Sequence, residues 1–244
     1  MGKVRVFANR GASAYEPENT TAAIRKAIAL RADGIVLNVH LSKDGIPVVI
    51  YDASLDRVPN GKGCVADCTL QELKRLNVGK KDTFDFMQIP TLEDAYRILA
   101  PSKLAINIEL MTRVYPYPGI EEKVLELEQS YGLEGRVVYS SFNHESLINI
   151  RSLKPDAKTG LLFSDGWYHI FDYARNTIGT NELHIPLDLV RREGFVDAAH
   201  EEGFAVAVQD VEESSEIREC LARGVDILIT GRPDLCRVII ADMI

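Results

Sequence analysis

Eight short apolar stretches recur along the chain, and a longer stretch with helical periodicity follows each of them. Short β-branched apolar stretches predict buried strands, and apolar residues spaced by three or four predict amphipathic helices. A strand–helix unit repeated in this way is typical of a (β/α)₈ TIM barrel, which needs about 250 residues. The length of 244 residues agrees. The predicted strands are VRVFA (4–8), GIVLNVHL (34–41), LAINIEL (104–110), RVVYSS (136–141), TGLLF (159–163), ELHIPL (182–187), AVAVQDV (205–211) and DILIT (226–230).

The segments between these strands predict the outer helices of the barrel. One unit departs from the repeat, because residues 47–76 begin with an extra strand after the KDG turn. This pattern predicts a small hairpin excursion after the second strand. We found no linker or low-complexity tract, so residues 1–244 are interpreted as a single domain. The predicted helices are 20–30, 92–100, 120–132, 145–154, 167–176, 194–203, 215–224 and 234–243.

The composition argues against several classes of partner. The net charge is −8 and the acidic residues are spread along the chain, which disfavours nucleic acid and anionic membranes as partners. No apolar stretch approaches the roughly 20 residues of a membrane span, and the start MGKVRVF has no apolar leader, so we expect a cytoplasmic protein. The oligomeric state is not predicted.

The four cysteines lack the paired spacing of a structural zinc site, and we expect free thiols. The alternative is that the CVADC pair chelates a metal or forms a disulfide. The cysteines are Cys64, Cys68, Cys220 and Cys236.

In a barrel of this kind, functional side chains lie at the carboxyl ends of the strands. Strand alternation predicts one polar-containing face that lines the mouth and one aliphatic face that contacts the helices. The predicted mouth residues of two strands are Val36, Asn38, His40, Asn107, Glu109 and Met111. Their aliphatic alternates are Ile35, Leu37, Val39, Ile106, Ile108 and Leu110.

Several motifs, in order and spacing, resemble those of the glycerophosphodiester phosphodiesterase family over essentially the whole chain. The resemblance implies a barrel enzyme that cleaves glycerophosphodiesters to glycerol 3-phosphate and an alcohol. Such enzymes use a divalent cation held by carboxylates, and two histidines that move protons to and from the reacting oxygens. The motifs are NRGASAYEPENTTAAIRKAI, ADGIVLNVHLSKDGIPVVIYD, LDRVPNGKG, IPTLEDA, INIEL, SSFNHESL and GVDILITGRPD.

Residues that the resemblance assigns to proton transfer are replaced in this sequence. The first family histidine precedes the Arg-Gly that aligns with Arg10, and its position holds Asn9. The second family histidine aligns with Tyr51. Asparagine does not titrate, and a tyrosine with a pKa of about 10 exchanges protons poorly at pH 7. We therefore expect no intact catalytic proton relay.

The resemblance assigns the cation to three positions, which hold Val36, Asn38 and Glu109 here. Only Glu109 keeps a carboxylate, so we expect no tightly bound cofactor cation; the alternative is weak Ca²⁺ or Mg²⁺ at Glu109. A family lysine becomes Met111, a common tryptophan aligns with Gln209, and Gly231 replaces a usual aspartate. These departures are interpreted as a lost active site at the barrel mouth of a maintained fold.

Arg10 and Glu109 survive and allow two interpretations. In the functional one, Arg10 presents its planar guanidinium to an anion, and a small phosphorylated or glycerol-containing ligand contacts Arg10, Asn38, Glu109 and Gln209. In the structural one, Arg10 and Glu109 form a salt bridge, because an unpaired carboxylate in a closed mouth is unfavourable. The structural interpretation needs no ligand, and we prefer it.

Other histidines and aromatic residues lie near the predicted mouth. His40 is the best placed histidine, but proton transfer requires a position within about 3 Å of a substrate oxygen, so we assign no role to it. The other histidines are His144 in the loop after the fourth strand, His184 within the sixth, and His169 and His200 on helices. Tyr115 and Tyr117, with Trp167 and Tyr168, either pack their loops or form the wall of a ligand pocket; we prefer packing for the first pair.

The sequence therefore predicts a pseudoenzyme that is retained for binding or interaction. Two alternatives remain open. One is an active phosphodiesterase with a rearranged site that uses Glu109, His40 and a weakly held divalent cation. The other is a scaffold whose function lies on its outer surface.

Overall fold

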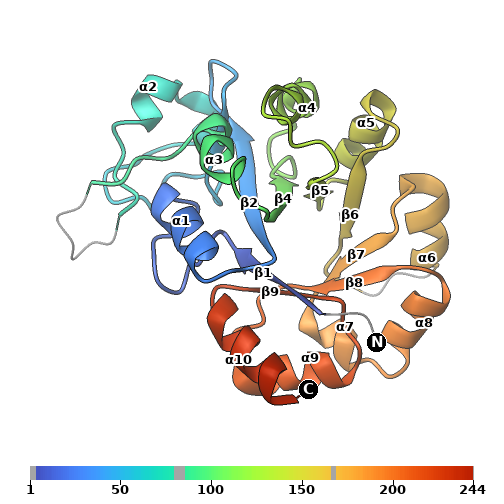
Figure 1. Cartoon of the computed structure of the whole chain (residues 1–244). Coiled ribbons are helices and arrows are strands. Elements are labelled where there is room, and N and C mark those ends of the chain that lie inside the picture. Colours follow the sequence, from blue (N-terminus) through green and yellow to red (C-terminus); the bar gives the residue numbers. More distant parts are fainter. Residues whose placement is uncertain (1–3, 80–85, 166–168, 244) are drawn as a thin grey trace.

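A computed structural model describes residues 4–79, 86–165 and 169–243 and shows a closed barrel of parallel strands (Figure 1). Each strand pairs with its neighbours in the ring, and β1 pairs with both β2 and β9, which closes the barrel. The predicted (β/α)₈ fold is confirmed. The strands are β1 (Arg5–Asn9), β2 (Gly34–Leu41), β3 (Pro47–Val49), β4 (Ala105–Leu110), β5 (Val137–Ser141), β6 (Lys158–Leu162), β7 (Glu182–Ile185), β8 (Ala205–Val208) and β9 (Ile227–Thr230).

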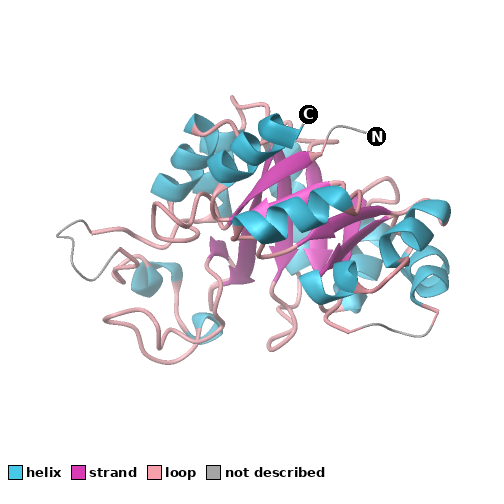
Figure 2. Cartoon of the chain, turned by 90° about the horizontal axis from the view of Figure 1, so that it is seen from below, coloured by secondary structure: helices cyan, strands magenta, loops and turns pink. Residues whose placement is uncertain are grey.

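Helices surround the strands, as Figure 2 shows from below. Most lie where the periodicity predicts them, but the short segments η1, α2 and α7 were missed. The predicted helix 167–176 begins outside the described residues and continues as a π-helical segment, η2. The helical segments are α1 (Thr21–Ala29), η1 (Val65–Asp67), α2 (Leu70–Leu73), α3 (Leu92–Leu99), α4 (Ile120–Ser130), α5 (His144–Leu153), α6 (Ile170–Asp172), η2 (Tyr173–Ile178), α7 (Leu187–Arg191), α8 (Phe195–Glu201), α9 (Ser214–Ala222) and α10 (Pro233–Met243).

The two faces of the strands differ as predicted. The aliphatic alternates of β2 and β4 pack with helices α1, α3 and α4 in one buried cluster. The inward side chains of β1, β2, β8 and β9 form a small apolar plug inside the barrel, which consists of Phe7, Val36, Ala207, Ile227 and Ile229. Val36 was predicted among the mouth residues. That prediction is wrong, because its side chain is fully buried in the plug.

The predicted hairpin excursion is confirmed. β3 runs antiparallel to β2, and Val48 pairs with His40. The chain beyond β3 has its own small apolar cluster, in which Val48 packs with Leu55 and Leu73 among others. In Figure 1 this subregion lies at the upper left, beside α2. It places the residues after β3 over one side of the barrel mouth.

The first and last units of the barrel are joined by side chains as well as strands. One carboxylate oxygen of Asp33 accepts a hydrogen bond from the backbone N–H of Val6, and the other lies 2.9 Å from an Nη of Arg237 on α10. All four cysteines are free thiols, as predicted. Within the described part of the chain, no helix is both long and apolar enough to cross a membrane.

Candidate functional site

Asn9 is the last residue of β1 and lies at the barrel mouth. Its Nδ2 donates a hydrogen bond of 2.7 Å to Oδ1 of Asp210, in the loop after β8. Asp210 has a φ of 56°, in the left-handed region that short polar residues tolerate best. The amide therefore anchors a neighbouring loop where the family resemblance implies a proton carrier.

Arg10 follows directly and is held by two contacts. Its Cζ lies 3.4 Å from the centroid of the Tyr51 ring, and its Nη1 donates a 2.7 Å hydrogen bond to Glu18. Arg57 binds the other oxygen of Glu18 at 2.7 Å. Burial alone would raise the pKa of Glu18, but the two guanidiniums outweigh it and lower that pKa.

The prediction of a salt bridge between Arg10 and Glu109 is wrong. The structure describes both residues and pairs them with other groups. Glu18, eight residues after Arg10 in the same loop, takes the guanidinium instead. Glu109 finds a neutral partner, since Nδ2 of Asn38 donates a 2.9 Å hydrogen bond to its Oε2. The strand register places Asn38 and Glu109 side by side on β2 and β4.

A third residue, Asn19, completes this hydrogen-bonded chain, and sequence reasoning missed it. Its Nδ2 donates to Oδ1 of Asn38 at 3.0 Å, and its own Oδ1 accepts from the Asn38 backbone N–H at 3.3 Å. These contacts orient the Asn38 amide, so that its nitrogen faces Glu109. Its burial and its φ of 58° just before α1 are visible only in the structure, so no signal in the sequence singles it out.

Glu109 lies in a poorly hydrated position. The residue is 6% exposed, and burial raises the pKa of its carboxyl from 4.5 to about 7. Arg10 and the Asn38 amide lower this pKa, whereas Asp210 raises it, but burial outweighs them. A cavity of about 240 Å³ opens beside the carboxyl, and Tyr51, Met111 and Phe142 are among its lining residues, most of which are apolar.

The cation that the family resemblance implies does not fit these residues. Hard divalent ions bind several oxygen ligands, usually with more than one carboxylate. Of the three positions that the resemblance assigns to the cation, Glu109 alone holds a carboxylate. Asn38 presents its N–H to Glu109, and the thioether of Met111 lies 3.5 Å from that nitrogen. Within residues 4–79, 86–165 and 169–243, no cluster of three or more His, Cys, Asp or Glu side chains is arranged to hold a metal ion.

His40 is fully buried, and both of its ring nitrogens have partners. Nδ1 lies 2.9 Å from the Tyr117 hydroxyl and Nε2 lies 3.1 Å from the Tyr51 carbonyl oxygen. Because a carbonyl only accepts, Nε2 carries the proton and Nδ1 accepts from Tyr117. Burial lowers the pKa of His40 to about 4, so the ring is neutral at pH 7.

The other predicted histidines are also bound within the structure. His184, in β7, lies 2.7 Å from Glu182, and His200, on α8, lies 2.9 Å from Asp226. His144 was placed in a loop but begins α5, where its Nε2 lies 2.9 Å from a backbone carbonyl. His169 precedes α6 rather than lying on it.

Of the four aromatic residues predicted near the mouth, two are packed in their loop and two lie outside the described residues. Tyr117 is 6% exposed, and Tyr115 donates a hydrogen bond to the Cys64 sulfur, which supports the packing interpretation. Trp167 and Tyr168 lie outside the described residues.

Gln209 and Gly231 lie on the loops at the mouth. The Gln209 N–H bonds the carbonyl of Ile185, and the Gly231 N–H bonds Glu212 at 2.6 Å. A Cβ on Gly231 would lie 2.8 Å from the Ser13 hydroxyl and 3.2 Å from the Ala14 nitrogen, so a side chain there would require Ser13 to move.

Comparison with known proteins agrees with this fold. Residues 10–235 match the Glycerophosphoryl diester phosphodiesterase family. The chain belongs to this family. Its family resemblance, predicted from the motifs, is therefore confirmed.

Relatives and solved structures of the family match over nearly the full length. The glycerophosphodiester phosphodiesterase of Caldanaerobacter subterraneus subsp. tengcongensis is 37% identical over 234 residues, which is 95% of this chain and 96% of that protein. An Oleispira antarctica phosphodiesterase, solved in complex with the product sn-glycerol-3-phosphate, has a TM-score of 0.90 and 25% identity, with 97% and 96% coverage. The glycerophosphodiester phosphodiesterase of Agrobacterium tumefaciens has a TM-score of 0.83 and 26% identity, with 97% and 100% coverage.

Proposed function

We propose that this chain is a binding member of the glycerophosphoryl diester phosphodiesterase family that does not hydrolyse diesters by the usual mechanism. The observation that carries the proposal is the contact between Asn38 and Glu109. An amide N–H fills the place beside the carboxylate where a shared cation would need a second negative oxygen. Asn19 fixes the amide in that orientation.

Neither position that the resemblance assigns to a catalytic histidine holds a histidine. Asn9 donates to Asp210, and the Tyr51 ring lies beneath Arg10. His40 is neutral and bonded at both nitrogens, so it has no free position for a substrate oxygen. These residues bind and orient, but none of them exchanges protons readily near pH 7.

The proposed ligand is a small phosphorylated or glycerol-containing molecule. Two facts support this choice: the Oleispira relative binds sn-glycerol-3-phosphate, and Arg10 lies at the mouth with a planar guanidinium suited to phosphate oxygens. The cavity beside Glu109 suits the less polar end, because Met111 and Phe142 contribute to its lining. Binding would use Arg10, Asn38, Glu109 and Gln209.

One observation favours a second candidate, an active enzyme with a rearranged site. A carboxyl whose pKa is about 7 is well matched to general acid–base catalysis at neutral pH, and Glu109 has such a pKa. This candidate would use Glu109 as the proton carrier, with His40 as a neutral hydrogen-bonding group and a weakly held Ca²⁺ or Mg²⁺.

A direct assay separates the two candidates. The purified protein is incubated with glycerophosphocholine or glycerophosphoethanolamine and with calcium, magnesium or manganese, and released glycerol 3-phosphate is measured; the Caldanaerobacter relative serves as the control. We expect no turnover above background. Turnover that is abolished by Glu109→Gln would refute the proposal and establish the second candidate.

Binding is tested separately by calorimetry with sn-glycerol 3-phosphate. We expect saturable binding that Arg10→Gln weakens. Absence of binding, or equal affinity in Arg10→Gln, would refute the assignment of the ligand.

The variant Asn38→Asp tests whether the second carboxylate is what the site lacks for binding a cation. This variant restores a second carboxylate, so calcium should raise its melting temperature and leave that of the wild type unchanged. A calcium-dependent rise in the wild type would show that Glu109 already holds a cation.

A further inference from the structure

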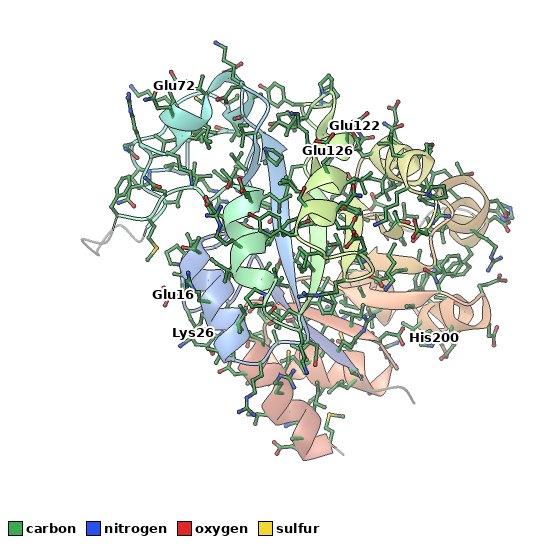
Figure 3. All side chains as sticks on the ribbon, turned by 45° about the horizontal axis from the view of Figure 1, so that its top comes forward. Glu16, Lys26, Glu72, Glu122, Glu126 and His200 are labelled. Atoms are coloured by element: carbon green, nitrogen blue, oxygen red, sulfur yellow. The ribbon has the colours of Figure 1, made fainter. Side chains whose placement is uncertain are left out.

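The inside of the barrel is apolar on one side and polar on the other. The apolar plug described above lies on the side that β1, β2, β8 and β9 form. The side that β4 to β7 form is called the polar side of the interior here. The labelled side chains in Figure 3 lie on outer helices and loops, whereas the polar side lies within the ring of strands. Its residues are Asn107, Ser140, Gly160, Glu182 and His184.

The strand register places these residues on the inward face. Residues that pair across parallel strands share a face, and so do residues two apart along one strand. Asn107 pairs with Val36, and His184 pairs with Ala207; Val36 and Ala207 both belong to the plug. The intervening strands continue the same face through the register pairs Glu109–Ser140, Ser140–Gly160 and Gly160–Glu182.

Three side chains of the polar side have buried polar atoms without a hydrogen-bond partner among the described residues. These atoms are Nδ2 and Oδ1 of Asn107, Oγ of Ser140 and Nδ1 of His184. Each of the three residues is at most 1% exposed. Burying such groups without a hydrogen bond is unfavourable, and most buried polar groups in proteins bond either to protein or to ordered water. Four such atoms on one side of a closed barrel therefore point to a bound partner.

Glu182 determines which nitrogen of His184 carries a proton. Burial alone would raise the pKa of Glu182, but the hydrogen bond with His184 and the nearby Arg5 outweigh it and lower that pKa. The ionised carboxylate only accepts hydrogen bonds, so Nε2 of His184, 2.7 Å from Oε1 of Glu182, carries a proton. In the neutral ring, Nδ1 is then an acceptor that needs a donor. Gly160 lets the ring lie against β6, because a Cβ there would clash with Nε2.

The mixture of donors and acceptors selects the kind of partner. Nδ2 of Asn107 needs an acceptor, which a metal ion cannot provide. Oδ1 of Asn107 and Nδ1 of His184 need donors, which a simple anion cannot provide. A water molecule both donates and accepts, and it is small enough for a closed interior. Proteins contain about one buried water per 27 residues, so such a site is ordinary for a chain of 244 residues.

We propose that the polar side of the barrel interior is a binding site for ordered water. The water accepts a hydrogen bond from Nδ2 of Asn107 and donates to Nδ1 of His184, and it also bonds Oδ1 of Asn107 and the hydroxyl of Ser140. The site borders the mouth at Glu109, which pairs with Ser140 in the strand register. It uses none of the residues of the proposed ligand site, so the inference does not depend on the proposed function.

A high-resolution crystal structure of the wild-type protein tests the site directly. We expect water density at about 2.7–3.2 Å from Nδ2 of Asn107 and from Nδ1 of His184. Direct hydrogen bonds among Asn107, Ser140 and His184, with no density between them, would overturn the proposal. A peak at about 2.3–2.6 Å from oxygen atoms alone would show a metal ion instead and would also overturn it.

Oxygen-17 magnetic relaxation dispersion tests the same site in solution, because it counts water molecules that exchange slowly. Asn107→Leu/Ser140→Ala should lose at least one of them. The matched control is Thr159→Val, because the buried Thr159 hydroxyl also lacks a partner in the described part of the chain but lies on the opposite face of β6 from Gly160. The control should keep the wild-type number. An unchanged number in the double variant, or an equal loss in the control, would refute the site.

The stability of Ser140→Ala distinguishes a hydroxyl bonded to water from one without any partner. Removing a hydroxyl that bonds water should raise the unfolding equilibrium constant by about twofold to tenfold. Removing a hydroxyl without a partner removes an unfavourable buried group, so the constant should stay the same or fall. An unchanged or lower constant in urea unfolding would therefore contradict the proposal.

Discussion

Replacing Glu109 with glutamine should make the protein more stable at pH 8 and change its stability little at pH 5. Burial raises the pKa of Glu109 from 4.5 to about 7 in the folded state. Below pH 4.5 the carboxyl is protonated in both states. Between these two values the unfolded chain loses the proton while the folded protein keeps it, so stability falls as the pH rises toward 7. Above pH 7 the carboxyl is ionised in both states, and the stability does not fall further for this reason.

The size of the effect follows from the shift in pKa. A shift of this size corresponds to about 3 kcal/mol at 1.36 kcal/mol per unit. Glutamine keeps the acceptor for the Asn38 N–H and carries no charge. The free energy of unfolding of Glu109→Gln should therefore exceed that of the wild type by up to about 3 kcal/mol at pH 8. At pH 5 the difference should be less than about 1 kcal/mol.

Urea unfolding at several pH values measures these differences directly. Glu201→Gln, at an exposed position on α8, provides the control and should follow the wild-type curve at every pH. A constant difference between Glu109→Gln and the wild type from pH 5 to 8 would refute the reasoning. Lower stability of the variant at pH 8 would show that ionised Glu109 has a favourable partner.

Three further predictions concern buried groups. Gly160→Ala places a Cβ 2.4 Å from Nε2 of His184, so it should lower the free energy of unfolding by about 1–3 kcal/mol in chemical denaturation; wild-type stability would contradict the packing. Lys154→Met leaves Glu128 buried without its cation, so it should lower the free energy of unfolding by about 3–5 kcal/mol in the same assay. An unchanged free energy of unfolding would show that the ion pair contributes nothing to stability. His40 should stay neutral from pH 5 to 8, since its pKa is about 4, and an NMR titration midpoint near 6.5 would disprove the buried contacts.

The fold was predictable because it repeats. Strand alternation correctly separated the aliphatic residues of β2 and β4 from the polar ones, and the KDG turn correctly marked β3. Short elements were not predictable in the same way. α7 has five residues and follows Pro186 without a clear apolar period, so the sequence showed only the end of a strand there.

The chemistry of the mouth was predictable as a set of residue types but not as a set of contacts. Sequence order showed that Arg10 and Glu109 remain, and opposite charges suggested a pair. Only the structure shows that Glu18 lies closer to the guanidinium and that Asn38 faces the carboxylate. Such choices depend on strand register and loop conformation, to which residues far apart in the chain contribute.

Ring closure has a consequence for how this chain is made. β1 forms hydrogen bonds with β9 as well as with β2, and Arg237 on α10 binds Asp33 at the start of the second unit. During synthesis β1 (Arg5–Asn9) can therefore pair with β9 (Ile227–Thr230) only after all the intervening units have been made. Until then one edge of the incomplete sheet has unpaired backbone N–H and C=O groups, and such an edge can pair wrongly with other chains.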